Sequence, residues 1–439
     1  MYRTIDCTDS TEIDRVLWFF SESTYAGLYS EAPRSIRLRT DYTREEVRPW
    51  DHETLVLMLK KLPHLKDVHM DNALFEYHTL VHLLQALPKL TKLTLTLSPE
   101  TVHLNRTRDP KTSLQSFHSI SSGLTTSVND ITITNLAWYE LDKPVDLTLL
   151  SFGTLFRLPT VKRYCLDIGT WCSLVRIKIS HSKNGLIGFD GPPQLQELVI
   201  YSKEYIEDGD LANEAHVKAL FRQLHACREH LIVFHLLVSY QLPVNTKPNS
   251  KELDKIVFRR LEQFLGPLSL QRLLAFPDTV HTIWNTAPGR ILTGPGVRDL
   301  IGEPTRFTQL RYLSVGFWDL KMSPLSAVLA NVPELAEISF STTALEDQKE
   351  IEDLAKEFTS CPSLRAVSVL STTAGHPLPS KGVSEVLACW VNRLSKLDYV
   401  RLDPYRFWSR KHGVVAGEEW ETNVDTSRQC FVPTAMTSM

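Results

Sequence analysis

The sequence predicts an α/β solenoid, a curved stack of repeated helix and strand units with parallel strands on the concave face and helices on the convex face. Three observations support this. A phrase close to Leu-Pro-x-Leu-x-x-Leu-x-Leu recurs along the 439 residues, an amphipathic helical pattern precedes it, and the clear copies are regularly spaced. A single helix and strand cannot bury their own apolar faces, so repeated units of this kind must stack.

The recurring phrase predicts a short strand after a tight turn. Apolar residues two apart face the core, while the residues between them face outward. Clear copies lie at residues 62–70, 87–95, 192–200, 307–315, 332–340, 361–369 and 394–402. Weaker copies lie at 128–133, 161–166, 174–179, 231–236 and 280–284, and the interval between Leu231 and Leu310 fits the pattern least well.

The segments before the clear copies predict helices. Leu55, Leu59 and Leu62 recur at i, i+4 and i+7, which places them on one helical face. A proline such as Pro63 follows and ends the helix, because it cannot donate a helical hydrogen bond. Anchor leucines of adjacent copies are 25 to 33 residues apart, which is typical of leucine-rich repeats of the longer, helix-containing kind.

The domain organisation follows from the extent of the pattern. We expect one irregular solenoid over residues 1–408, with capping strands and a helix in 1–45 and loop-like insertions at 98–129 and 241–252. Residues 409–439 are polar and lack apolar periodicity, so we expect a partly disordered tail.

Composition narrows the function classes. The net charge is −3, so the overall electrostatics do not favour nucleic acid or an anionic membrane. Seven scattered cysteines without a CxxC pair fit neither a disulfide framework nor a metal site, and this indicates a reducing, cytoplasmic or nuclear location. No leader-like segment and no apolar run of about 18 residues are present, so we expect neither secretion nor a membrane span.

The candidate chemistry is weak. Asp67, His69 and Asp71 share the outward face of one predicted strand, and an acid–base role is conceivable. Same-face neighbours on a strand are about 7 Å apart, and Lys92 on the next strand would pair with Asp67, so a solvated face is the favoured interpretation. The Gly294 to Gly296 turn lacks a phosphate-binding pattern. We therefore expect no enzyme, no cofactor and no metal.

The outward strand positions are the stronger functional signal, since stacking aligns them into one continuous surface large enough for a protein partner. Near the C-terminus, Tyr399 to Trp408 forms an aromatic and basic cluster that we favour as the binding hot spot, with capping by Phe407 and Trp408 as an equal alternative. The complete set of candidate protein-binding residues is Asp67, His69, Lys92, Tyr201, Tyr312, Ser314, Glu337, Ser339, Tyr399, Arg401 and Asp403.

The repeat arrangement resembles the ribonuclease-inhibitor-like leucine-rich-repeat superfamily, and more closely the fungal F-box/leucine-rich-repeat proteins. Two motifs carry the closer resemblance: residues 2–6 (YRTID) are similar to the strand that follows the F-box, and Phe407, Trp408 and Trp420 are similar to the aromatic endings. The resemblance implies the substrate-recognition region of a ubiquitin ligase receptor that holds a protein substrate on its concave face. The resemblance begins at the strand that follows the F-box, so we expect a Skp-type adaptor to bind only if an F-box lies upstream.

Two other functions remain open. The chain could be a leucine-rich-repeat scaffold or regulatory protein unrelated to ubiquitination, or an enzyme that uses Asp67, His69 and Asp71. In each case we expect a monomer.

Overall fold

The computed structural model describes the repeated helices and strands and the turns between them. The described residues are 4–8, 10–22, 33–40, 52–71, 73–75, 77–96, 127–134, 160–167, 194–201, 224–237, 256–266, 274–275, 278–285, 291–292, 307–318, 325–342, 348–371, 380–402, 406–410 and 420–424. The chain groups into two compact units, Met1–Ile256 and Val257–Met439. Both units are mixed α/β with a parallel sheet.

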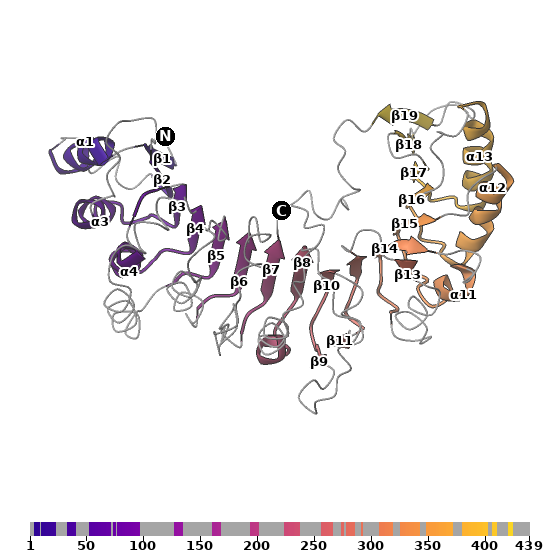
Figure 1. Ribbon diagram of the computed structural model, residues 1–439, viewed down its shortest axis with the longest axis horizontal. Helices are drawn as coiled ribbons and strands as arrows, with labels where there is room; N and C mark the ends of the chain where they lie inside the picture. The colour runs from indigo at the N-terminus through magenta and orange to yellow at the C-terminus, as the bar shows by residue number, and fades with distance from the viewer. Residues whose placement is uncertain are drawn as a thin grey trace, which may run out of the picture. The chain divides into compact units, whose positions relative to one another are not determined.

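The first unit contains a parallel sheet whose strands follow one another in chain order (Figure 1). The strands are β1 (Thr4–Cys7), β2 (Ser35–Arg39), β3 (Asp67–Asp71), β4 (Lys92–Thr96), β5 (Asp130–Thr134), β6 (Arg163–Asp167), β7 (Glu197–Tyr201) and β8 (Val233–Leu237). Each strand pairs with the next without a shift in register, so equivalent residues of successive repeats lie side by side.

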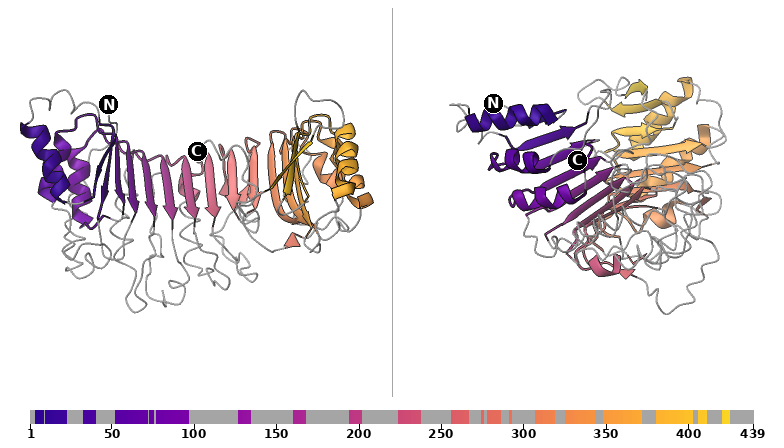
Figure 2. Two further views of the ribbon diagram at one scale, coloured as in Figure 1. Left: turned by 90° about the horizontal axis from the view of Figure 1, so that it is seen from above. Right: turned by 60° about the vertical axis from the view of Figure 1, so that its left-hand side comes forward.

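Three helices cover one face of this sheet (Figure 2): α1 (Ser10–Glu22), α3 (His52–Lys60) and α4 (Tyr77–Ala86). The predicted leucine stripes explain their position, because Leu55, Leu59, Leu80 and Leu84 are fully buried. Neighbouring helices also pack on one another, α1 on α3 and α3 on α4. The core of the first unit therefore lies between the helix layer and the sheet.

Strand residues alternate strictly between this core and the opposite face. On β3, β4 and β5 the inward residues are fully buried and the outward residues are partly exposed. The inward pairs Val68 and Met70 on β3 and Leu93 and Leu95 on β4 illustrate the period of two. We call the opposite side of the β1 to β8 sheet the outward face; its residues are partly exposed on β2 to β5, whereas Val233 and His235 on β8 are buried.

A backbone hydrogen-bond ladder fixes the start of each strand. The carbonyl oxygen of Lys66 accepts from the amides of both Thr91 and Lys92, at 2.8 and 3.0 Å. The same two-for-one arrangement recurs in the next repeat, where the carbonyl of Thr91 accepts from Asn129 and Asp130. Because each turn is tied to the turn before it, every strand begins at the same height, and the register of the sheet follows.

The second unit has a parallel sheet that ends in an antiparallel hairpin. Its strands are β10 (Gln263–Gly266), β12 (Thr282–Asn285), β13 (Ile291–Leu292), β14 (Tyr312–Trp318), β15 (Glu337–Thr342), β16 (Ala366–Ser371), β17 (Tyr399–Arg401), β18 (Arg406–Arg410) and β19 (Trp420–Val424). Pairing is parallel from β10 to β17, and β18 and β19 add antiparallel strands. Two further short strands are β9 (Ile256–Val257) and β11 (Leu274–Ala275).

Helices α11 (Leu325–Leu329), α12 (Gln348–Glu357) and α13 (Ser380–Arg393), with the short 3-10 turn η2 (Phe358–Ser360), cover one face of the second sheet (Figure 1). Trp390 of α13 is fully buried, and its indole N–H donates to the carbonyl of Ile351 in α12 at 2.9 Å. Its ring meets Phe358 edge-on, with centroids 5.8 Å apart. This aromatic contact and hydrogen bond hold the last two helices together.

Most predicted strands are confirmed, including the weak copies that become β5, β6, β8 and β12. One repeat was missed: β10 follows Phe258 and Leu261, which are buried and share the spacing of Phe307 and Leu310. Within residues 409–439, where we expected a partly disordered tail, the structure describes the end of β18 at Arg410 and the strand β19. The copy at 174–179, the insertion at 241–252 and the 98–129 insertion up to residue 126 lie outside the described residues.

None of the helices in the described parts of the chain has the length and apolar character needed to cross a bilayer.

Candidate functional site

The outward face of the first unit carries a row of alternating charges at the first position of each strand. The row consists of Asp67, Lys92, Asp130, Arg163 and Glu197, which pair in register from β3 to β7. We call these five residues the charge ladder. Neighbouring strands lie about 4.8 Å apart, so each charge faces an opposite one across one strand spacing.

Arg163 is the centre of the charge ladder. One terminal nitrogen, Nη1, lies 3.0 Å from Oδ1 and 3.2 Å from Oδ2 of Asp130, and Nε lies 3.0 Å from Oε2 of Glu197. Burial opposes the charge on Arg163, but the carboxylates of Asp130 and Glu197 outweigh it and raise the pKa of the guanidinium. Arg163 therefore stays charged and is held on both sides.

The Lys92 ammonium forms only a long ion pair within the charge ladder. Its Nζ lies 3.9 Å from Oδ2 of Asp130. The predicted pair between Lys92 and Asp67 is in register, yet the ion pair forms with the carboxylate on the other side. Asp130 is shared between two cations, which draws Lys92 toward β5.

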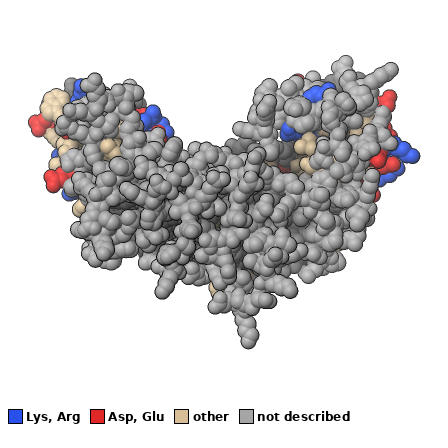
Figure 3. Space-filling view, in the orientation of Figure 1, with Lys and Arg blue, Asp and Glu red and all other residues tan. Residues whose placement is uncertain are grey.

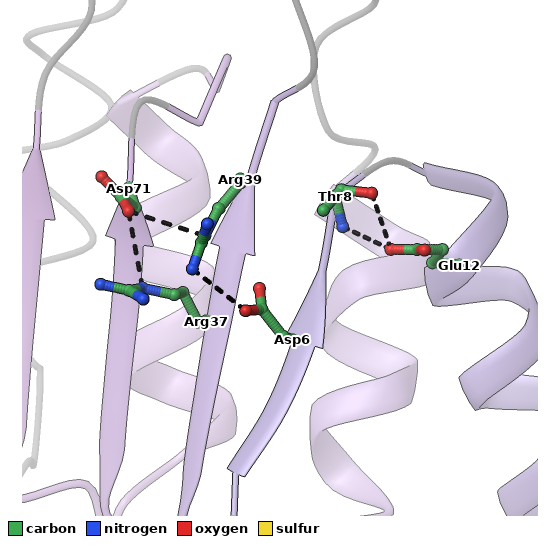
Figure 4. A network of polar contacts seen from close by, with 6 residues as sticks. All are labelled: Asp6, Thr8, Glu12, Arg37, Arg39 and Asp71. Carbon is green, nitrogen blue, oxygen red and sulfur yellow. Dashed lines mark hydrogen bonds and ion pairs between the residues drawn. The ribbon is translucent and has the colours of Figure 1, made fainter.

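A second cluster of charges lies on β1, β2 and β3 (Figure 4). Arg39 places Nη2 3.1 Å from Oδ2 of Asp6 and Nε 3.7 Å from Oδ2 of Asp71. Arg37 approaches the same Asp71 oxygen with its Nε at 3.5 Å. Asp71 thus lies between two arginines on the outward face, and Arg39 bridges two carboxylates.

His69 lies at the centre of β3, between Asp67 and Asp71. Its pKa is lowered by burial and by Lys92, an effect that Asp67 opposes; Arg37 lowers it further and Asp71 raises it. Among the described residues, His69 makes no hydrogen bond to either aspartate. The predicted outward triad is therefore assembled on one strand, but its members are not connected as an acid–base relay would require.

Beside this histidine lies a square of four threonines, Thr94 and Thr96 on β4 and Thr132 and Thr134 on β5. The hydroxyl of Thr134 donates to that of Thr96 at 2.9 Å. Cys165 follows on β6 and is buried, with 9% of its surface exposed. The middle of the outward face is therefore small, polar and uncharged between two charged areas.

In the second unit, the sheet face opposite the helices has a partly exposed section on β14 and β15. Tyr312 pairs in register with Glu337, and Ser314 pairs with Ser339. All four side chains are partly exposed, as predicted for candidate contact residues. This polar and aromatic section is smaller than the outward face of the first unit.

The predicted hot spot at the C-terminal end needs correction. Arg401 is only 6% exposed, and its register neighbour Ser368 is 2% exposed, so neither presents an open contact surface. Tyr399 stacks on Phe407 with centroids 5.1 Å apart, and Trp408 is buried opposite Val400. The burial of Trp408 favours a capping role over a binding role for this residue, because β18 covers the edge of the last parallel strand.

Two other candidates lie partly or wholly beyond description. Asp403 lies outside the described residues. Tyr201 ends β7 and pairs with Asp167 and Leu237 through its backbone.

Sequence reasoning missed a cluster around His281 in the turns before β10, β12 and β14. The imidazole Nδ1 is 2.9 Å from the hydroxyl of Thr282, and Nε2 is 3.7 Å from Oε2 of Glu262. Burial lowers the pKa of His281, Glu262 opposes this effect, and Arg311 adds to it. The order of groups resembles a nucleophile, base and acid, but Thr282 is only 4% exposed and no substrate could reach its hydroxyl.

Other concave or charged features are modest. A shallow hollow of about 440 Å³ lies between α3 and α4, on residues such as Val56, Leu57 and His82. In the parts of the chain that the structure describes, no three His, Cys, Asp or Glu side chains gather as metal ligands do. Acidic and basic atoms of described residues lie close to one another in the space-filling view (Figure 3).

No protein-family model and no curated protein matches the sequence. One solved structure that the chain resembles is titled "Crystal structure of TLR13-ssRNA13 complex". The two chains are 13% identical, with a TM-score of 0.38, and the alignment covers 85% of this chain and 47% of that one. This chain therefore spans about half the length of that protein.

Proposed function

We propose that the protein is a non-catalytic leucine-rich-repeat solenoid that binds a protein partner on the outward face of its first unit. The observation that carries this proposal is the in-register alignment of polar and charged side chains over β2 to β7, together with the full burial of the inward residues of β2 to β5. A core packed in this way fixes the positions of the outward side chains before any partner arrives, which lowers the entropic cost of binding.

The composition of the face favours a polar protein surface as the partner. Charged groups of both signs alternate along the charge ladder and around Asp71. Arrangements of this kind select partners by charge complementarity, and they disfavour the uniform negative charge of a nucleic acid backbone. The threonine square between them offers hydroxyl groups to a backbone or to side chains.

The finer proposal is that this face recognises the substrate of an F-box-type ubiquitin ligase, with the F-box supplied upstream of the described repeats. The support is the resemblance of residues 2–6 and of the aromatic C-terminal segment to such receptors. Under this proposal the protein acts in the cytoplasm or nucleus, and a Skp-type adaptor binds only when the F-box is present. A scaffold that uses the same face without ubiquitination is the alternative.

We also propose that Asp67, His69 and Asp71 have no catalytic role. The supporting observation is the lack of a hydrogen bond from His69 to either aspartate among the described residues. The open sheet face around them is a further argument, because catalysis benefits from an enclosed site that excludes water.

Affinity capture with the full chain tests the binding proposal. Replacing Thr94 and Thr132 together with arginine places two bulky side chains in the middle of the outward face, at partly exposed positions. Gln85→Arg, at an exposed position of α4, is the matched control, because it adds the same side chain to the helix layer. Circular dichroism and thermal unfolding establish that all variants fold.

The proposal predicts that the retained partner is lost with the double threonine variant and kept with Gln85→Arg. Equal retention by both variants would exclude the outward face as the binding surface. A parallel capture with an F-box fused upstream tests the finer proposal: recruitment of a Skp-type adaptor and a cullin together with the same partner supports the ligase role, and recruitment without that partner contradicts it.

A further inference from the structure

Three side chains form a row across β2, β3 and β4 in the centre of the charged part of the outward face. Arg37, His69 and Thr94 are paired in register. Strand spacing places each about 4.8 Å from the next. All three are partly exposed. We call them the Arg37 row.

Arg37 differs from Arg39 and Arg163 in the number of carboxylates that its guanidinium contacts. Its Nε lies 3.5 Å from Asp71, and among the described residues its two terminal nitrogens have no ion pair. Arg39 and Arg163, in contrast, each contact two carboxylates. Figure 4 shows the terminal nitrogens of Arg37 directed away from Arg39 and Asp6, and the side chain is 43% exposed. The two-pronged end of Arg37 is therefore available to a ligand.

The local charge balance is suited to a single negative charge. Around His69, the effect of Lys92 exceeds that of Asp67, and the effect of Arg37 exceeds that of Asp71, so the cations prevail at the imidazole. The two aspartates nevertheless remain close by and would repel a doubly charged phosphate. A monoanionic carboxylate fits this balance better than a phosphate does.

We propose that the Arg37 row binds the carboxylate of a single Asp or Glu side chain of the protein partner. This inference rests on the proposed binding function of the outward face and names the chemistry of the partner at one point of it. The guanidinium of Arg37 donates two hydrogen bonds to the two carboxylate oxygens, in the planar geometry that arginine provides. Thr94 and His69 lie in line to donate further hydrogen bonds.

A bound carboxylate would change the protonation of His69. The charged groups that face this imidazole are Arg37, Asp67, Asp71 and Lys92. A new negative charge beside it favours the imidazolium and raises the pKa of His69 in the complex. Binding then takes up a proton, and affinity rises as the pH falls through the titration range of the histidine.

Isothermal titration of the full chain with a synthetic nonapeptide tests the inference. The peptide carries a single central glutamate, and its matched control carries glutamine at the same position. Arg37→Gln removes the two-pronged donor, whereas Arg15→Gln, the matched control, removes an exposed arginine from helix α1 in the helix layer. His69→Gln keeps a hydrogen-bond donor and removes the titration.

We expect the glutamate peptide to bind and the glutamine peptide not to bind. Arg37→Gln should weaken binding about 10-fold or more, which corresponds to one charged hydrogen-bonded contact, while Arg15→Gln stays within about 2-fold. Arg37→Lys should recover only part of the affinity, because it restores the charge but not the planar donor pair. His69→Gln should abolish the rise in affinity between pH 7.5 and pH 5.5.

Three results would overturn the inference: no binding of the glutamate peptide, equal binding of both peptides, or displacement of the peptide by inorganic phosphate with the same dependence on Arg37. The third would assign the row to a phosphate group. Failure here is distinguishable from failure of the proposed function, because the captured partner is then lost with the double threonine variant but retained by Arg37→Gln.

Discussion

The charge ladder is predicted to stabilise the first unit through Arg163, and a double-mutant cycle measures this. Arg163→Met keeps the aliphatic stem and removes the charge, and Asp130→Asn keeps the shape of the carboxylate and removes its charge. In the native protein, Nη1 of Arg163 lies 3.0 and 3.2 Å from the two carboxylate oxygens of Asp130, so a single guanidinium nitrogen contacts both oxygens.

The magnitude follows from the geometry and exposure of the pair. The side chain of Arg163 is 33% exposed and that of Asp130 is 20% exposed, so the pair lies between a surface pair and a buried one. Exposed pairs contribute about 0.2 to 1 kcal/mol, and hydrogen bonds to charged groups about 1.5 to 3 kcal/mol. We expect a coupling energy of about 1 kcal/mol, and a larger loss of about 1 to 2 kcal/mol for Arg163→Met alone, since it also releases Glu197.

Urea unfolding of the four proteins, followed by circular dichroism, provides the assay. The cycle is repeated in 1 M NaCl, where the Debye length is about 3 Å and part of the coupling should persist because the pair is half-buried. The exposed pair of Lys356 and Asp353 on α12 is the control, and any coupling between these two residues should disappear in 1 M NaCl. A coupling within about 0.3 kcal/mol of zero for Arg163 and Asp130 would refute the reasoning.

Three further predictions follow. Leu261→Ala should destabilise the second unit by about 2 to 5 kcal/mol in urea unfolding if β10 is a true repeat, because Leu261 is fully buried; a loss like that of an exposed residue would contradict this. Burial raises the pKa of the Cys361 thiol to about 11, so a thiol reagent at pH 8 should modify this cysteine only after unfolding, as peptide mapping would detect. Burial is the main cause of the lowered pKa of His281, so the unfolded chain binds the proton more tightly than the folded chain does. The free energy of unfolding should therefore fall as the pH drops below about 6.5 and level off below the folded pKa. His281→Gln should make the midpoint of urea unfolding less dependent on pH between pH 8 and pH 5.

The repeated architecture could be predicted because local signals and packing agree. The stripe of Leu55 and Leu59, the helix-ending Pro63 and the alternation of Val68 and Met70 each specify one part of the same unit. Where a repeat lacked some of these local signals, the sequence did not predict it. The repeat at Leu261 has Arg259 where the clear copies have proline, and Phe264 and Gly266 where they have the two apolar strand residues, although the anchor spacing could have revealed it.

The sequence predicted which residues lie on the outward face but not which of their charged side chains form ion pairs. Register followed from the repeat, so Lys92 was correctly placed beside Asp67. The choice of ion-pair partner depends on the strand beyond, since Asp130 attracts both Lys92 and Arg163. Asp130 and Arg163 are 33 residues apart in the sequence. This separation gave no indication that Lys92, Asp130 and Arg163 interact with one another.

The C-terminal cluster shows why residue type alone does not identify a binding surface. Tyr399 and Arg401 are the residue types that carry interface energy, but a last parallel strand also needs a neighbour for its open edge. Here β18 supplies that neighbour, Phe407 stacks on Tyr399, and Trp408 is buried opposite Val400. An arginine that is 6% exposed requires partners within the fold, so Arg401 contributes to the end of the sheet. Arg37, at 43% exposure and with its terminal nitrogens directed outward from its neighbours, meets the physical requirement for a contact residue that Arg401 does not.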